Sequence, residues 1–371
     1  MEFSLNRDIL LKSLNHTQGV VERKSTLQIL SNVLIEASSS KIKLTCTDMD
    51  IIFIEEINNV QVKKEGSTTT SASVLYEIVR KLNQNSSVNL TLISENKLQL
   101  ISEKSKFNLN CLPANDFPLT QEDISSNNAG IEANLFLKLL NKTKFAISND
   151  ETRHYLNGIY LHKTKILNQI FLTAVATDSH RLSLSNLPLK NDIEFNPIIL
   201  PKKAIMQLSS LLENSNENIK ISNDKSKIKF QLKDSVLISK IIDGKFPDYN
   251  QVIPKKNEKI LEVNHKEFIM SVDRVISVSS DKKEGVKMNL SENKMNLSVN
   301  NPNSGDGMEI INCKFNSKDM NISFNSKYLM DMASQIEADK IIFKFNEPGS
   351  PVLAIDPIDK NSLFVLMPMK I

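Results

Sequence analysis

The sequence predicts an α+β protein built from three repeated domains, each with two helices packed on antiparallel sheets. Three observations lead to this prediction: three segments open alike, further anchors recur at the same spacing, and helical and alternating stretches follow one order in every block. Strands joined mostly by short turns favour antiparallel pairing, and amphipathic helices then cover one face of each sheet.

The repeat is clearest where each block begins. The segments 3–14, 131–145 and 261–276 each join a strand-like start to apolar residues at helical spacing, and each holds an Asn that can cap the helix. Aligning the three caps gives steps of 128 and 130 residues between Asn6, Asn134 and Asn264.

Two further anchors agree with this period. Asp48 and Asp178 each follow an apolar strand and are 130 residues apart, and the Phe-Pro dipeptides at 117–118 and 246–247 are 129 apart. These spacings predict three domains, at 1–126, 127–254 and 255–371.

Each block also repeats one order of elements. After the first helix come strands of alternating polarity, such as SKIKLTCTDMDIIFIEEI in the first block and ILNQIFLTAVATDSHRLSLSNL in the second. A second helix is predicted at 73–83, 201–214 and 326–337, and further strands separated by turn residues close each block. Each domain should therefore hold two helices and about eight strands.

Local signals place the helix ends. Ser73 is suited to an N-cap, Pro201 to a first helical turn, and Asn264 with Glu267 forms a capping-box pattern. The buried stripe of that last helix is predicted to be Phe268, Ile269, Val272, Val275 and Ile276.

The composition excludes several classes of protein. The sequence contains no run of about 18 apolar residues, so we expect no membrane span. The N-terminus also lacks the basic start and apolar stretch of a signal peptide. Three scattered cysteines and five histidines show no metal-ligand spacing, so we expect no metal, no cofactor and no disulfide. The cysteines should be small buried side chains in a reducing, cytoplasmic protein.

The stretch TAVATDSHRLSLSNLP at 173–188 allows two interpretations. Asp178, Ser179 and His180 are the residue types of a hydrolase, but neighbours in an extended segment point to opposite faces and no GxSxG elbow is present. We therefore expect no catalytic residues and no enzyme. The same residues can grip a ligand, or merely stabilise a loop in which Arg181 pairs with a carboxylate.

The repeat has a consequence for assembly. Two chains of three domains present six similar units, and a head-to-tail contact that mimics the contact between domains can close a ring. Net charge is only +3, so contact with nucleic acid would be local rather than a bulk effect. Cations that recur on the helices are candidates for a phosphate-facing surface, with solvated helix faces as the alternative: Lys12, Arg80, Lys81, Lys138, Lys142, Lys144, Lys202, Lys203, Lys266, Arg274 and Lys327.

Four motifs in order carry a resemblance that runs essentially end to end. They are RHYLNG at 153–158, TAVATDSHRL at 173–182, DGKFPDYNQVIP at 243–254 and VLMPMKI at 365–371. Together they resemble the bacterial sliding clamp, the beta subunit of DNA polymerase III and a processivity factor. The resemblance implies a non-enzymatic ring homodimer that encircles duplex DNA without sequence preference. It also implies that the ring is opened by a clamp loader and tethers the polymerase catalytic subunit and other replication and repair proteins.

The resemblance also implies a pocket between the second and third domains that takes short peptides rich in Gln, Leu and Phe. Leu and Met suit an adaptable apolar floor, and His180 and Arg181 would be polar donors at its rim. The residues carried over are Leu156, Thr177, His180, Arg181, Leu182, Pro247, Val252, Asn325, Tyr328, Val365, Met367, Pro368 and Met369.

For DNA, the positions that match the inside of the ring are Lys24, His154, Tyr155 and Lys202. The lysines would meet phosphates, and the contacts would be independent of sequence and sensitive to salt. The alternative is a monomeric peptide-binding scaffold that never closes around DNA.

Three positions depart from the family pattern. Ser179 stands where glycine is usual, which would strain the loop if the backbone there needs a positive φ. Gln251 replaces a common Arg, and Lys370-Ile371 replaces Arg-Leu. These departures bear on peptide preference rather than on the family.

Overall fold

The computed structural model describes residues 1–22, 26–119, 124, 129–213, 215, 217–279 and 285–369. The chain divides into two compact units. One comprises Met1–Leu137 and Ile193–Ile241, and the other comprises Lys138–Asp192 and Ile242–Ile371. The division runs through the central part of the chain, so the predicted second domain contributes to both units.

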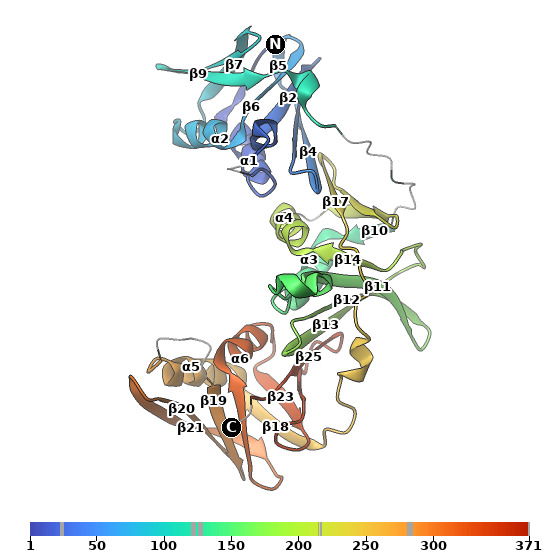
Figure 1. Ribbon diagram of the computed structural model, residues 1–371, viewed down its shortest axis with the longest axis vertical. Coiled ribbons are helices and arrows are strands. Elements are labelled where there is room, and N and C mark those ends of the chain that lie inside the picture. Colours follow the sequence, from blue (N-terminus) through green and yellow to red (C-terminus); the bar gives the residue numbers. More distant parts are fainter. Residues whose placement is uncertain are drawn as a thin grey trace. The chain divides into compact units, whose positions relative to one another are not determined.

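The first block forms two α-helices and nine strands among its described residues, close to the prediction. In Figure 1, α1 and α2 lie side by side next to the strands of this block. The elements are β1 (Glu2–Asn6), α1 (Arg7–Thr17), η1 (Gln28–Ser31), β2 (Asn32–Ser38), β3 (Lys41–Thr47), β4 (Ile51–Asn58), β5 (Gln61–Lys64), β6 (Gly66–Ser71), α2 (Ala72–Lys81), β7 (Ser87–Ser94), β8 (Lys97–Ser102), β9 (Ser105–Leu112) and η2 (Ala114–Asp116).

The second block repeats this order with two α-helices and eight strands in its described part. Its elements are β10 (Ala129–Glu132), α3 (Ala133–Lys144), η3 (Glu151–Leu156), β11 (Gly158–Ile166), β12 (Gln169–Thr177), β13 (Arg181–Pro188), β14 (Ile198–Pro201), α4 (Lys202–Leu212), β15 (Asn218–Asn223), β16 (Lys227–Gln231), β17 (Ser235–Lys240) and η4 (Tyr249–Gln251).

The third block again has two α-helices and eight strands where it is described, and α5 and α6 pack together beside β19–β21 (Figure 1). Its elements are β18 (Lys259–Asn264), α5 (His265–Ile276), β19 (Gly285–Ser291), β20 (Lys294–Asn301), β21 (Gly305–Phe315), β22 (Met320–Asn325), α6 (Ser326–Ala333), β23 (Lys340–Phe345), β24 (Val352–Ile355) and β25 (Ser362–Leu366).

All the strand pairs described are antiparallel, as expected. In the first unit the sheet order is β10-β15-β16-β17-β4-β3-β2-β6-β9-β8-β7-β1-β5. In the second unit it is β11-β12-β13-β25-β24-β23-β18-β21-β20-β19-β22. Each unit thus contains one place where the strands of consecutive blocks pair, β17 with β4 and β25 with β13.

These two places have the same register. Residues 51–55 of β4 face 239–235 of β17, and residues 181–185 of β13 face 366–362 of β25. Since Asp48 precedes the first run by three residues and Asp178 precedes the second by three, the repeat extends to individual backbone partners. We call them the first junction (β4 with β17) and the second junction (β13 with β25).

The helix caps correct several predictions. Asn6 and Asn264 do cap α1 and α5, accepting N–H bonds from Asp8 and Glu267 at 2.8 and 2.9 Å. Asn134 does not, because α3 begins at Ala133 and Asn134 lies in its first turn.

The other helix ends shift by a few residues. The N-cap of α2 is Ser71 rather than Ser73, since the helix starts at Ala72, one residue before the predicted range. Pro201 is the N-cap of α4 and not its first helical residue. The helix predicted at 326–337 already ends at Ala333, with Ser334 as its C-cap.

The cores follow the predicted periodicity. Phe268, Val272, Val275 and Ile276 are buried on α5, while Ile269 packs against the same core and stays half-buried. All three cysteines are free and buried, as predicted. None of the helices in the described ranges is long and apolar enough to cross a membrane.

Candidate functional site

The turn between β12 and β13 is held by its own polar residues. The Asp178 carboxylate accepts the N–H groups of His180 and Arg181, both at 3.0 Å, and the Thr177 hydroxyl donates to the Arg181 carbonyl at 2.7 Å. Ser179 sits at the apex with φ of 76°. The position therefore does need the left-handed conformation that favours glycine.

Ser179 has a compensating contact. The Arg153 guanidinium donates to the Ser179 hydroxyl at 2.6 Å and to the Asp150 carboxylate at 2.8 Å. Both bonds involve a charged group, which makes them stronger than neutral hydrogen bonds. The carboxyl of Asp150 has a lowered pKa because Thr152 first, and then Arg153, donate hydrogen bonds to it.

Arg181 lies beneath this turn and not at a rim. Its side chain is 7% exposed, and it donates to Asp178 at 3.0 Å and to Asp331 of α6 at 2.6 Å. The guanidinium also lies over the Tyr328 ring, 4.3 Å from its centre. The prediction of a rim donor is wrong for Arg181, because two carboxylates already bind the side chain; it positions the turn and Tyr328.

His180 is the exposed member of the pair. Its ring stacks against Tyr328 with the centres 6.2 Å apart and an angle of 24° between the planes. Burial, and after it the charge of Asp178, raises the pKa of the Tyr328 hydroxyl, so the phenol stays neutral and can donate or accept a hydrogen bond. Tyr328 and His180 together present an aromatic surface with polar tips.

The C-terminal segment is attached to the same turn. The Met367 N–H donates to the His180 carbonyl at 2.8 Å, and the Met369 N–H donates to the Ser323 carbonyl at 2.7 Å. Met369 is 41% exposed, whereas Met367 and Pro368 are half-buried. Two methionines and a proline thus lie next to the aromatic pair.

The predicted pocket residues differ in burial. Leu156, Leu182 and Val365 are buried, and Leu182 faces Val365 in the register of the second junction. Asn325 caps α6 by accepting the Tyr328 N–H at 3.3 Å. The accessible apolar members are Pro247, Val252 and Met369.

Sequence reasoning missed three supports of this surface. Asp331 follows Tyr328 by three residues on α6, a spacing that places both on one helix face, so this residue could have been found. Phe145, whose ring centre is 5.3 Å from the Arg181 guanidinium, and Arg153 gave no signal of their own.

The DNA candidates that the structure describes belong to different units. His154 and Tyr155 belong to η3 of the second unit, and the ring Nε2 of His154 is 3.2 Å from the Asp243 carbonyl. Lys202 is the exposed first residue of α4 in the first unit. Lys24 lies outside the described residues.

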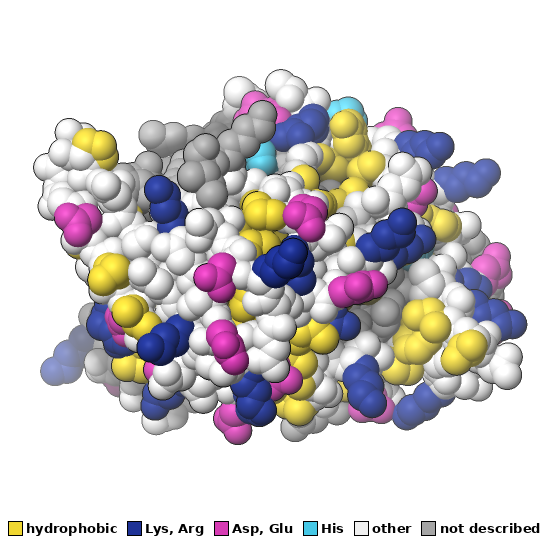
Figure 2. Space-filling model, turned by 90° about the horizontal axis from the view of Figure 1, so that it is seen from below, with side chains coloured by type: hydrophobic (Ala, Val, Ile, Leu, Met, Phe, Trp, Pro, Cys, Tyr) yellow, Lys and Arg dark blue, Asp and Glu magenta, His cyan; other side chains and the backbone are white. Residues whose placement is uncertain are grey.

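The wider set of cations is largely engaged in ion pairs. Lys142 is 3% exposed and binds Glu337 at 3.0 Å and the Gln335 carbonyl, so it cannot belong to a phosphate-facing surface. Arg274 binds Glu309, and Lys203 binds Asp48. On the face drawn in Figure 2, Lys and Arg side chains alternate with Asp and Glu and form no single basic field.

The residues suggested for a hydrolase do not form a catalytic arrangement. The Ser179 hydroxyl accepts from Arg153, Asp178 binds backbone N–H groups and Arg181, and the His180 ring stacks on Tyr328. Each of the three side chains is thus occupied by a partner outside the supposed triad. Among the described residues, no group of three or more His, Cys, Asp and Glu side chains could hold a metal ion.

Comparison with known proteins covers the whole chain. Models of the DNA polymerase III beta subunit match in three parts: the N-terminal domain at residues 1–121, the central domain at 130–248 and the C-terminal domain at 250–370. The beta sliding clamp of Caulobacter vibrioides is 38% identical and that of Escherichia coli 29% identical, each over 100% of both chains.

Solved structures agree with the sequence comparison. A crystal structure of the Caulobacter crescentus beta sliding clamp with bound polyethylene glycol has a TM-score of 0.96 at 38% identity, covering 100% of this chain and 99% of the other. The sliding clamp (DNA polymerase III subunit beta) of Bartonella birtlesii, bound to griselimycin, has a TM-score of 0.95 at 36% identity, with 100% of both chains covered.

Proposed function

The chain belongs to the DNA polymerase III beta subunit family, and from that membership we propose that it is a sliding clamp that confers processivity on the replicative polymerase. It would act as a cytoplasmic homodimer that encircles duplex DNA and binds short motifs of replication and repair proteins. A sliding clamp is not an enzyme. We assign its three clamp domains to 1–126, 127–254 and 255–371.

The observation that supports the ring best is the shared register of the first and second junctions. In both, the strand after the Asp-containing turn of one domain pairs with the last strand of the next. The third domain has the corresponding strand, β21, and the first domain has the corresponding last strand, β9. By the same pattern, the start of β21 of one chain would pair with β9 of a second copy, and this contact repeats itself head to tail.

Both strands are available for such a pairing. Residues 305–309 of β21 pair with β20 on one side, and residues 105–109 of β9 pair with β8 on one side. In the described part of the chain, β18 and β6 meet these strands only farther along, at 313–315 and 111–112. A partner strand would complete each of them, as edge strands commonly require.

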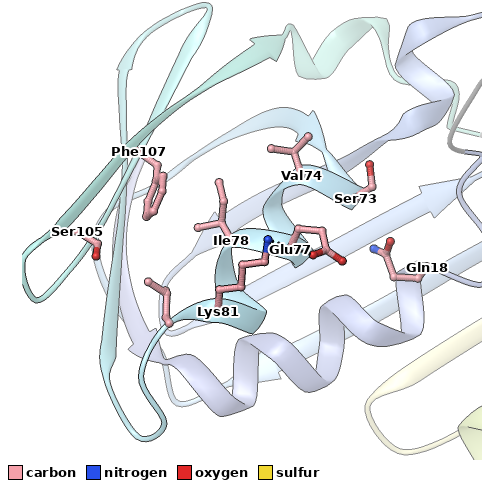
Figure 3. Close-up of a pocket in the computed structure, with 9 residues that line it drawn as sticks. Gln18, Ser73, Val74, Glu77, Ile78, Lys81, Ser105 and Phe107 are labelled. Atoms are coloured by element: carbon pink, nitrogen blue, oxygen red, sulfur yellow. Dashed lines mark ion pairs between the residues drawn. The ribbon is translucent and has the colours of Figure 1, made fainter.

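Apolar side chains accompany both strands. Next to β9, a hollow of about 560 Å³ opens between β9 and α2, lined among others by Val74, Ile78 and Phe107 (Figure 3). On β21, Met308 and Ile310 are exposed apolar residues, and Met270 of the neighbouring helix α5 is exposed as well. We assign these two surfaces to the contact between subunits, since burying exposed apolar groups stabilises such an interface.

For partner peptides we propose the surface around Tyr328. Its accessible part comprises Thr177, His180, Tyr328, Pro247, Val252, Met367, Pro368 and Met369, supported by Leu156, Arg181, Leu182, Asn325 and Val365. Flexible methionines beside an aromatic pair suit the Leu and Phe side chains of a short motif. Griselimycin, bound in the Bartonella relative, is a suitable competitor.

For DNA we propose Lys24, His154, Tyr155 and Lys202 as contacts to the backbone. No bulk positive charge supports tight binding, so retention must come from encirclement, with weak contacts that fade as salt rises. A ring that slides needs such weak contacts.

The first experiment is the solution mass by light scattering. A ring of two 41.9 kDa chains should be found at about twice that mass and should be retained on circular but not on linear DNA. A stable monomer would remove encirclement and favour a peptide-binding scaffold.

The pocket is tested separately by replacing Leu182 and Met369 with Ala. The double variant should bind a labelled peptide rich in Gln, Leu and Phe about a hundredfold more weakly while remaining dimeric, since it removes an accessible apolar contact at Met369 and the buried support at Leu182. Unchanged affinity in the folded dimer would rule out this surface as the peptide site.

A further inference from the structure

Four aromatic rings hold the segment that joins the second and third domains. Tyr160 and His162 stand two residues apart on β11 and so share one face of the strand. The Tyr160 ring stacks on Phe246 with centres 4.9 Å apart and an angle of 7°, and the His162 ring stacks on Tyr249 at 5.6 Å and 18°. We call these four residues the aromatic clasp.

One hydrogen bond joins the strand residues of the clasp to the segment between β17 and β18, which we call the linker. The Tyr249 hydroxyl and the His162 Nε2 are 3.1 Å apart, and both residues are buried, as is Phe246. The other ring nitrogen of His162, Nδ1, is buried with no hydrogen-bond partner among the described residues. The ring is therefore oriented by Tyr249, a residue of the linker, and the two strand residues hold the linker in return.

The linker depends on this clasp because it has little regular structure. Between β17 and β18 the only element described is the short η4. Before the clasp, Gly244 has φ of 138° and approaches Tyr155 so closely that a Cβ on it would lie 3.2 Å from the Tyr155 Cβ. After it, the Val252 N–H donates to the Tyr249 carbonyl at 3.1 Å.

Two of the accessible pocket residues are placed by the clasp. Pro247 directly follows Phe246, and Val252 is bound through its N–H to Tyr249. Neither side chain is buried, so its own packing does not fix it. The position of both must come from the backbone that the four rings hold.

We propose that Tyr160, His162, Phe246 and Tyr249 are positioning residues for the partner-peptide pocket, fixing the wall formed by Pro247 and Val252. The proposal rests on the peptide-binding function proposed above. It assigns to β11, a strand that contributes no accessible residue to the pocket, a part in peptide affinity. A preformed wall favours binding because less ordering is needed when the peptide arrives.

The test measures peptide affinity by fluorescence anisotropy with a labelled peptide rich in Gln, Leu and Phe. Replacing Phe246 and Tyr249 together with Leu should weaken binding about tenfold, since it removes both stacked pairs. Tyr249→Phe keeps the stack and loses the hydrogen bond, so its affinity should fall about threefold. The matched control is Phe230→Leu, which replaces a buried aromatic residue of the first unit whose ring packs at a tilt against Phe136, and which should leave affinity unchanged.

A second readout is amide hydrogen exchange at residues 243–252. Exchange there should be faster in both clasp variants and unchanged in Phe230→Leu, even if the double variant folds poorly and only Tyr249→Phe is usable. Wild-type affinity in a dimeric Tyr249→Phe or double variant with faster linker exchange would overturn the proposal. If the wild-type chain fails to bind the peptide, the peptide-binding function fails instead, and exchange still reports whether the clasp holds the linker.

Discussion

The first and second junctions have the same turn and strand register, but different side chains cover their strands. The turn at Asp48 repeats the bonds of the turn at Asp178: its carboxylate accepts the N–H groups of Asp50 and Ile51 at 2.9 and 2.6 Å. The Thr47 hydroxyl donates to the Ile51 carbonyl at 2.8 Å, and Met49 has φ of 78°, close to that of Ser179.

The side chains above the strands are different. In the first junction Ile52, Ile54 and Ile238 form a small cluster that is closed by Ile124 of the chain's own first linker. The residues at the matching places of the second junction include Leu182 and Val365. Arg181, at the start of β13, binds Asp178 of the turn and Asp331 of α6 and lies over the Tyr328 ring.

The difference shows where function enters a repeated fold. One turn and one strand register build both junctions, but the first closes over an aliphatic cluster and the second is organised by a buried cation beside an aromatic pair. Among the described residues, the turn of the first junction exposes Met49, whereas beside the second junction the His180 ring, which stacks on Tyr328, and Met369 are accessible. The repeat therefore determines the scaffold, and a few side chains determine which junction can take a partner.

The largest expected effect comes from removing the buried cation. Arg181→Met leaves Asp178 with its backbone N–H donors alone and Asp331 with Lys327 alone, and breaking a buried pair costs about 3–5 kcal/mol. Urea denaturation should show this loss, and peptide binding should disappear with it. The matched change in the first junction, Ile51→Val, removes one buried methylene and should cost about 1 kcal/mol without affecting peptide binding. Equal losses would mean that the two turns are held in the same way.

This contrast also shows what the sequence could and could not predict. The spacing of apolar residues shows both the period of about 130 residues and the order of helices and strands. Three α+β domains could therefore be predicted from the sequence. Pairing of Arg181 with a carboxylate was one of the interpretations that the sequence left open, and the structure confirms it. The identity of the second carboxylate, Asp331, did not follow from the sequence, because it lies 150 residues away along the chain. The clasp was missed for a similar reason: nothing local links Tyr160 to Phe246.

Two of the predicted helix caps were wrong by one or two residues. Ser71 and Ser73 are equally suitable by type, and only the hydrogen bond from the Val74 N–H to Ser71 identifies the cap. Asn134 was chosen because it aligned with Asn6 and Asn264, although the helix of its own block starts one residue before it. Residue type limits the choices within a turn, and packing decides among them.

The second prediction concerns the cover of the first junction. Ile124→Ser should cost about 2 kcal/mol, because it exposes the cluster of Ile52, Ile54 and Ile238 and buries a hydroxyl among aliphatic groups. Hydrogen exchange should be faster in β4 and β17 and unchanged in β13 and β25. Peptide affinity should stay at its wild-type value; a loss would mean that this cover also contributes to the peptide site.

The third prediction concerns the effect of low pH on the linker, which His162 helps to hold. Burial lowers the pKa of His162 to about 4, below its ordinary value of 6.5, so folding favours the neutral ring. The stability it contributes is complete above pH 6.5 and is lost as the pH falls toward 4, by about 1–2 kcal/mol between pH 6.5 and 5. Linker exchange at 243–252 should rise over that range, corrected for the intrinsic pH dependence of exchange.

The control for the acid effect is His162→Phe. Phenylalanine can keep the stack on Tyr249 but cannot gain a proton, so its linker exchange should lose the extra rise between pH 6.5 and 5. The same rise in this variant would assign the effect to other groups, such as the carboxylates of the second junction.

The smallest effects should have opposite signs at the two equivalent turns. Replacing a residue in the left-handed conformation by glycine relieves about 1–2 kcal/mol of backbone strain in the folded state. The same change lowers the free energy of unfolding by about 0.4–1 kcal/mol, because the unfolded chain gains conformational entropy. Met49→Gly should therefore stabilise the first turn by about 0.5 kcal/mol. Ser179→Gly gains the same but loses the hydrogen bond from Arg153, a bond to a charged group with a contribution of about 1.5 kcal/mol.

The net result at Ser179 should be a destabilisation of about 1 kcal/mol, read from local exchange in the turn. This explanation is tested in an Arg153→Gln background, because that variant removes the charge that holds the Ser179 hydroxyl. In that background Ser179→Gly should become stabilising, as Met49→Gly is. If it stays destabilising, the serine is tolerated at this apex for a reason other than Arg153, and the two turns differ in backbone strain as well as in side chains.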